Sequence, residues 1–146
     1  MSNNALESGF TDTPLNQLLE AMSKQKTSLK EFASEGPVVF RFSMHDVRIK
    51  DNRGLALAAH AAQLAKQPLI TIFIFSPGDY KAHDRAPVRI DFVLRNLAYV
   101  QKELAKLHIP LITDTCRKRK EMGPFVLQML KQFKASSLFG YVVSIC

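Results

Sequence analysis

The run Leu69-Ile70-Thr71-Ile72-Phe73-Ile74-Phe75 is the feature that most constrains the fold of this chain. It is an almost unbroken series of β-branched and aromatic residues, which is typical of a strand covered on both faces. Further strand patterns occur at 38–42, 109–113 and 137–143, and helical patterns lie between them at 55–65, from Pro87 onward and at 122–133. This alternation favours right-handed crossovers between parallel strands. We therefore expect an α/β fold: a Rossmann-like three-layer α/β/α arrangement with four or five parallel strands.

Residues 1–36 differ from the rest and are predicted to be an N-terminal extension. Residues 1–12 are polar and are expected to be disordered. Thr13-Pro14 then supplies a helix N-cap followed by proline at the first helical position. Apolar residues at helical spacing continue to about Lys24, which predicts one short amphipathic helix: Leu15, Leu18, Leu19 and Met22. Gly36-Pro37 closes the extension, and 37–146 is the predicted α/β domain.

Composition narrows the environment in which the protein works. The chain has 146 residues, of which 47% are hydrophobic, enough for one domain with a real core. No apolar run approaches the roughly 18–20 residues of a membrane span, and no signal peptide is visible, so we expect no membrane association. The two cysteines do not form a disulfide framework. We therefore expect a reducing compartment, the nucleus or the cytoplasm.

Charge is spread unevenly along the chain. Residues 1–36 hold three Lys against five acids, whereas residues 37–146 hold 17 Lys and Arg against eight acids. A basic domain is compatible either with a polyanionic partner or with an ordinary solvated surface.

Ligands of parallel sheets bind beyond the carboxyl ends of the strands. In this chain those ends carry 44–52, 76–86 and 114–120. The first turn lacks the glycines of a phosphate cradle and contains Asp46, Arg48, Asp51 and Asn52 instead. Two interpretations remain open for these four residues: an ion-pair network that fixes the loop, or contact with a cofactor or a neighbouring domain.

Other chemistry-bearing residues do not form a complete site. Asp79, His83 and Asp84 share the second loop, as exposed polar residues commonly do, and no histidine pair has metal-ligand spacing, so we expect no metal. Cys116 precedes four basic residues, which suits an activated thiol, a nucleic-acid patch or simply a solvated loop. No nucleophile elbow or P-loop is present. We predict no catalytic residues in this chain.

Taken together, the ordered motifs resemble the N-terminal α/β domain of the DNA photolyase/cryptochrome family, and are most similar to its fungal cyclobutane-dimer photolyases. The resemblance covers about residues 37–140. It rests on Asp46-x-Arg48-x-x-Asp51-Asn52-x-x-Leu55, Phe73-Ile74-Phe75-Ser76-Pro77, Asp79-Tyr80, Ala82-His83, Pro87-x-Arg89-Ile90-Asp91-Phe92-x-Leu94-Arg95-Asn96-Leu97 and Ile109-Pro110-Leu111. By this resemblance Arg89, Phe92 and Leu94 belong to a structural motif, and Asp46, Arg48, Asp51 and Asn52 are antenna-side or interdomain contacts.

The sequence departs from the family pattern in two places. The opening signature Trp-Phe-Arg-x-Asp-Leu-Arg is replaced by Phe42-Ser43-Met44-His45-Asp46-Val47-Arg48. After Gly140, Tyr141-Val-Val-Ser-Ile-Cys146 replaces an Asn-x-Glu-Tyr-Glu-like segment that helps hold the antenna pigment. From these differences we expect a domain truncated at its C-terminal end, with an incomplete antenna site.

The resemblance implies flavin-dependent, light-driven repair of pyrimidine dimers. In the family a folate or deazaflavin antenna passes energy to flavin adenine dinucleotide (FAD), and some members are mitochondrial. FAD and damaged DNA bind a helical domain that we expect this chain to lack, so we expect no repair by the chain alone. Two alternatives stay open: a stand-alone module that binds a pterin, deazaflavin or nucleotide, and an interaction domain that docks on a helical flavin-binding partner.

Overall fold

The computed structural model describes residues 35–140 of the chain. The helix predicted near residues 14–24 and the last part of the fourth predicted strand lie outside this range. The described elements are β1 (Val38–Phe42), α2 (Arg53–Ala65), β2 (Leu69–Phe75), α3 (Pro77–Ala82), α4 (Pro87–Lys106), β3 (Leu111–Thr115), α5 (Arg119–Phe133) and β4 (Ser137–Gly140).

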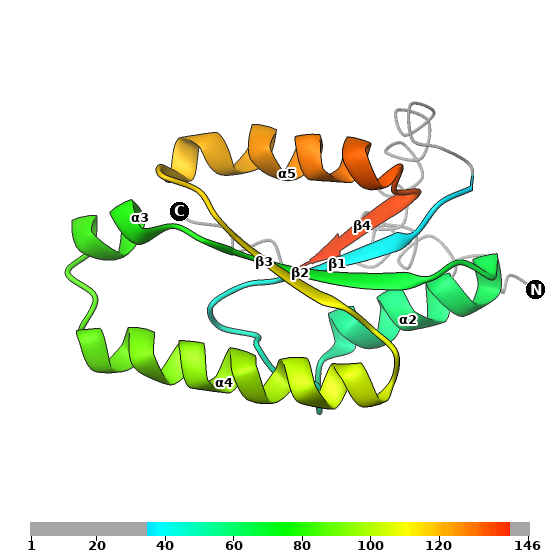
Figure 1. Ribbon diagram of the computed structural model, residues 1–146, viewed down its shortest axis with the longest axis horizontal. Coiled ribbons are helices and arrows are strands. Elements are labelled where there is room, and N and C mark those ends of the chain that lie inside the picture. The colour runs from blue at the N-terminus through cyan, green and yellow to red at the C-terminus, as the bar shows by residue number, and fades with distance from the viewer. Residues whose placement is uncertain (1–34, 141–146) are drawn as a thin grey trace, which may run out of the picture. The chain divides into compact units, whose positions relative to one another are not determined.

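All four strands run parallel, in the order β3-β2-β1-β4. Figure 1 shows α2 and α4 on one face of the sheet and α5 on the other, so the expected three-layer α/β/α architecture is confirmed. The strand order reverses between β1 and β4, because β2 and β3 extend to one side of β1 while β4 lies on its other side. In doubly wound sheets, ligands commonly bind near such a reversal, outside the carboxyl ends of the strands.

Alternating side chains of the strands build the two halves of the core. Phe40, Phe42 and Phe73 are almost fully buried and cluster with residues of α2 and α4. Val39 and Ile72, which point to the opposite face because side chains alternate along a strand, are completely buried. The α5 residues Val126, Met129 and Leu130 are buried in this second half. The predicted run Leu69–Phe75 is thus a strand with both faces covered, as expected.

Several boundaries differ from the sequence prediction. β3 begins at Leu111 rather than Ile109, because the Ile109 amide bonds to the carbonyl of Leu104 and closes α4 instead. α5 begins at Arg119, three residues earlier than expected. The predicted loop 76–86 contains the short helix α3, which proline at its first turn and Asp79 favour.

Close backbone contacts hold the segment just before β1 against the segment just before β4. A Cβ atom on Gly36 would lie 2.0 Å from the Lys134 carbonyl oxygen, so only glycine fits there. The Ser136 hydroxyl donates to the carbonyl oxygen of Gly36 at 2.9 Å, and the Ser136 amide donates to that of Pro37 at 3.0 Å. Within the described range, no helix is both long enough and apolar enough to cross a bilayer.

Candidate functional site

The loop that follows β1 is held by a buried carboxylate. Asp46 is only 5% exposed, and its Oδ1 atom accepts hydrogen bonds from the Ser43 amide (2.5 Å) and the Ser43 hydroxyl (2.8 Å). Its second oxygen, Oδ2, is buried and has no hydrogen-bond partner among the described residues. Asp46 therefore organises the turn while keeping one buried acceptor unused.

Asn52 joins the loop to helix α2. Its side-chain oxygen accepts from the Leu55 amide at 3.0 Å, which confirms the predicted N-cap. Its Nδ2 group donates to the carbonyl oxygens of Asp46 (3.1 Å) and Arg48 (3.0 Å). At 4% exposure, Asn52 uses its side chain to fold the loop.

The interpretation of the loop as an ion-pair network is wrong in its detail. Across residues 35–140, no ion pair joins Asp46, Arg48 and Asp51. Arg48 is exposed and donates through Nε and Nη2 to the Asp51 carbonyl oxygen, both at 3.3 Å. Asp51 adopts a left-handed backbone with φ of 52°. Hydrogen bonds between side chains and the backbone, rather than ion pairs, therefore shape this turn, and Asp51 and Arg48 are exposed.

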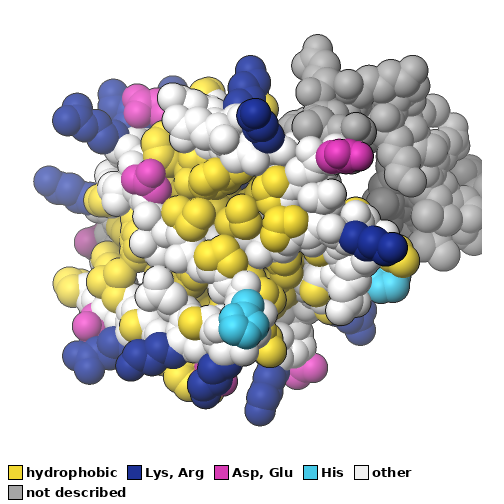
Figure 2. Space-filling view, turned by 45° about the vertical axis from the view of Figure 1, so that its right-hand side comes forward, with side chains coloured by type: hydrophobic (Ala, Val, Ile, Leu, Met, Phe, Trp, Pro, Cys, Tyr) yellow, Lys and Arg dark blue, Asp and Glu magenta, His cyan; other side chains and the backbone are white. Residues whose placement is uncertain are grey.

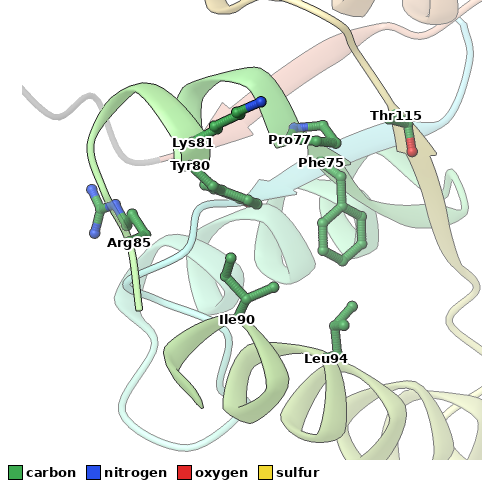
Figure 3. A pocket seen from close by; sticks show the side chains of 8 residues that line it. All are labelled: Phe75, Pro77, Tyr80, Lys81, Arg85, Ile90, Leu94 and Thr115. Atoms are coloured by element: carbon green, nitrogen blue, oxygen red, sulfur yellow. The ribbon is translucent and has the colours of Figure 1, made fainter. Parts of the chain in front are cut away.

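A cavity of about 370 Å³ lies at the neighbouring strand ends, between α3 and α4. Figure 3 shows the side chains of Phe75, Tyr80, Ile90 and Leu94 converging on one space, with Lys81 and Arg85 at its periphery. Pro77 and Thr115 complete the lining. Aromatic and aliphatic walls with a few polar groups at the rim are the usual features of a small-molecule site.

Tyr80 is a polar residue of this cavity wall. It is 9% exposed, and burial raises the pKa of its hydroxyl. The hydroxyl is therefore neutral at physiological pH and offers a hydrogen bond without introducing charge. The cations of Lys81 and Arg85 leave the rim positive.

The residues assigned to the structural motif lie on α4 and face different surroundings. Leu94 lines the cavity, Arg89 is exposed, and Phe92 is 69% exposed. Phe75 and Tyr80 belong to the motifs that carry the family resemblance, but sequence reasoning predicts no site role for them or for Arg85. The signal available for them was their position at the end of a buried strand and in the loop after it.

The remaining candidates stay separate from this cavity. Cys116 is buried as a free thiol whose Sγ lies 3.2 Å from the Lys118 carbonyl oxygen. His83 Nε2 lies 3.4 Å from Asp79 Oδ1, and no group of three or more His, Cys, Asp or Glu in the described part could hold a metal ion. Figure 2 shows a face on which hydrophobic side chains gather at the centre and Lys and Arg side chains project around its margin.

Comparison with known proteins places this arrangement in a family. The DNA photolyase family model matches residues 38–140. This chain belongs to the DNA photolyase family. It is 40% identical over 126 residues to a deoxyribodipyrimidine photo-lyase of Neurospora crassa, which covers 86% of this chain and 20% of that relative.

Two further relatives carry the same name. The mitochondrial deoxyribodipyrimidine photo-lyase of Saccharomyces cerevisiae is 31% identical over 104 residues, which is 68% of this chain and 18% of the relative. That of Vibrio cholerae is 29% identical over 95 residues, 65% of this chain and 19% of the relative. This photolyase-family chain therefore spans about a fifth of the length of the curated relatives that it matches, and the resemblance to the N-terminal α/β domain is confirmed.

Proposed function

We propose that this chain serves as the antenna-side α/β domain of a deoxyribodipyrimidine photo-lyase. In this proposal it binds a light-absorbing pterin or deazaflavin at the carboxyl end of its sheet. In the same proposal, dimer repair and FAD binding lie outside this chain, which matches 20% of the Neurospora crassa relative. The observation that carries the proposal is the cavity between α3 and α4, in a chain that belongs to the DNA photolyase family.

The lining residues fit such a pigment chemically. A pterin or deazaflavin ring is flat and apolar on its faces, which suits walls made by Phe75, Ile90 and Leu94. The neutral Tyr80 hydroxyl provides a hydrogen bond for a polar ring edge. Lys81 and Arg85 at the rim would hold an acidic tail. When bound, the pigment absorbs light and passes the excitation energy on, while the protein residues hold and orient it.

Direct binding tests this function. The purified chain is titrated with 5,10-methenyltetrahydrofolate and, separately, with an 8-hydroxydeazaflavin, and the fluorescence of each pigment is followed. We expect saturable binding of one of them. Leu94→Trp, which fills a half-exposed part of the cavity, should weaken binding about tenfold, or about 1.4 kcal/mol. Arg95→Met is the matched control, because Arg95 is exposed and paired with Asp91 at 2.8 Å away from the cavity lining.

Failure of both pigments to bind, or equal binding by Leu94→Trp and wild type, would refute the antenna proposal. Repair activity has its own test. The chain is mixed with FAD and an oligonucleotide that contains a thymine dimer, and the mixture is illuminated with blue light. We expect no repair, and dimer cleavage by this chain alone would overturn the proposed division of labour.

We propose docking on a helical flavin-binding domain as the second function, because α4 presents an exposed apolar row. Val88, Phe92 and Tyr99 are 75%, 69% and 62% exposed and lie along one side of the helix. An exposed row of this size is a common sign of an interaction surface. The test is a pull-down between this chain and the separately produced remainder of the Neurospora crassa relative. Phe92→Ser should abolish capture, whereas Leu64→Ser, an equally exposed change on α2, should not.

A further inference from the structure

The central strand β1 carries an arginine on the face covered by α5. Arg41 is the only charged residue in β1, β2 and β4. No carboxylate lies within ion-pair distance of Arg41 among residues 35–140. Burial lowers the pKa of this guanidinium, the charge of Asp46 partly opposes that effect, and the charge of Arg119 adds to it. Arg41 is thus a partly desolvated cation without a direct counter-ion.

Two of the Arg41 donor groups, Nε and Nη2, also lack a good acceptor among the described residues. Its Nη2 group contacts the thioether sulfur of Met122 at 2.8 Å. Its Nε group is buried and has no partner among the described residues. A thioether is a weak acceptor, and a buried charged donor that is left unpaired is costly. The site would therefore gain from an oxygen acceptor in place of the bare sulfur.

Met122 is placed so that it can acquire such an oxygen. It lies in the first turns of α5 and is half-buried, whereas Met129, farther along the same helix, is 7% exposed. Gly140 lies opposite Arg41 on β4, where a Cβ atom would be 3.2 Å from the Arg41 carbonyl oxygen and 3.6 Å from its Cβ atom, so the missing side chain allows the two strands to approach closely. The half-buried Met122 side chain thus has partial access to solvent.

We propose that Met122 is an oxidation site whose sulfoxide is captured by Arg41. The oxidant is a hydroperoxide, such as hydrogen peroxide. The sulfur lone pair attacks one peroxide oxygen, an S–O bond forms as the O–O bond breaks, and the proton on the transferred oxygen passes to the leaving oxygen. The sulfur is oxidised by two electrons, and hydrogen peroxide is reduced to water (an organic hydroperoxide to its alcohol). The new sulfoxide oxygen then accepts hydrogen bonds from Nε and Nη2 of Arg41. A methionine sulfoxide reductase reverses the step by using two thiols, and the oxygen leaves as water.

Oxidation at this site is expected to stabilise the protein, whereas methionine oxidation usually destabilises. Oxidation converts a flexible apolar side chain into a polar one and normally disrupts packing. Here the added oxygen would satisfy a buried donor of a charged group and tie β1 to α5. The inference is independent of the proposed function, because it requires neither a pigment nor a helical partner.

The test uses the full chain treated with dilute hydrogen peroxide, with the modified residues assigned by peptide mass mapping. We expect oxygen at Met122 and a melting temperature about 5 °C higher than that of the untreated chain. Methionine sulfoxide reductase should restore the original value. Because that enzyme acts on methionine sulfoxide and not on oxidised cysteine, the reversal also separates Met122 from the two thiols.

Variants decide whether Arg41 causes the effect. In Arg41→Leu, oxidation of Met122 should lower the melting temperature, and in Met122→Leu the rise should disappear. Met129→Leu is the matched control and should keep the full rise. Arg41→Lys retains the charge but not the two adjacent donors, so oxidation should raise its melting temperature by less than half of the wild-type increase. This variant replaces Arg41→Leu in the test if Arg41→Leu does not fold. A fall in the melting temperature of oxidised wild type, or a folded chain in which Met122 resists peroxide while Met44 reacts, would overturn the proposal.

Discussion

Replacement of Asn52 tests whether this residue stabilises the loop after β1 in the absence of any ligand. The side chain makes three hydrogen bonds: one caps α2, and two hold the carbonyls of Asp46 and Arg48. Loss of a cap costs about 1 kcal/mol. Each of the two other bonds contributes about 0.5–1.5 kcal/mol, and the carbonyls would be left unsatisfied. Asn52→Ala should therefore lower the free energy of unfolding by about 2–4 kcal/mol.

Two further substitutions separate the contribution of the cap from that of the two donor bonds. Asn52→Ser keeps a capping oxygen and loses only the donor bonds, so it should cost about 1–3 kcal/mol. Asn52→Asp keeps both the shape and the cap. It places a carboxylate oxygen where the amide donated, about 3 Å from two carbonyl oxygens, and should cost at least as much as the serine variant.

Urea unfolding at 25 °C, analysed by linear extrapolation, measures the free energy of unfolding of each variant. We expect the dependence of that free energy on urea concentration (the m-value) to stay unchanged. Gln63→Ala, an exposed change on α2, is the control and should stay within about 0.5 kcal/mol of wild type. If Asn52→Asp were as stable as wild type, the amide would not donate to the two carbonyls, and this account of the loop would be refuted.

Four other substitutions test the packing and the cavity. Gly36→Ala should lower the free energy of unfolding by about 1–3 kcal/mol, because the new Cβ atom clashes with the Lys134 carbonyl. Gly123→Ala, whose Cβ atom meets nothing within 4 Å inside α5, should raise it by about 0.5–1 kcal/mol. Urea unfolding measures both, and a lower free energy at both positions would contradict the geometry. Leu104→Ala removes a fully buried side chain and should cost about 2–5 kcal/mol in the same assay, and a cost below about 1 kcal/mol would show that the core closes around the gap. Burial raises the pKa of Tyr80, so its contribution to stability is complete below the unfolded-state pKa of about 10 and is lost as pH rises through the folded-state value. The free energy of unfolding of wild type should therefore fall more steeply above about pH 10 than that of Tyr80→Phe in pH-dependent urea titrations, and parallel curves would place the hydroxyl in water.

Much of the fold could be predicted because its signals are local. The strand Leu69–Phe75 follows from its composition, and the helix that begins at Pro87 follows from proline at the first turn and one apolar stripe. Asn52 was recognised as a helix cap because a capping residue acts within three positions of itself. Helix α3 was missed because six residues are too few to show a helical period, although Pro77 and Asp79 favour a helix start.

The candidate site was less accessible to sequence reasoning because it is assembled from distant segments. Phe75 and Thr115 approach each other only through the register of β2 and β3, which no local pattern encodes. Alternating charges suggested an ion-pair network at Arg48, but the left-handed backbone at Asp51 supplies a carbonyl oxygen to that arginine instead. Predictions of charge pairing fail where backbone geometry provides the nearer partner.

The position of β4 beside β1 has a consequence for co-translational folding. β1, the first of the described strands to be synthesised, pairs on one side with β2 and on the other with β4, and the Ser136 hydroxyl donates to the Gly36 carbonyl oxygen across 100 positions of sequence. At a translation rate of about 5–20 residues per second, one edge of β1 stays unpaired for about 5–20 seconds before β4 has been synthesised. During that interval the exposed edge of Val38–Phe42 invites pairing with other nascent chains. Slow translation between the codons for β1 and β4 should therefore lower the yield of soluble protein more than an equal delay after β4.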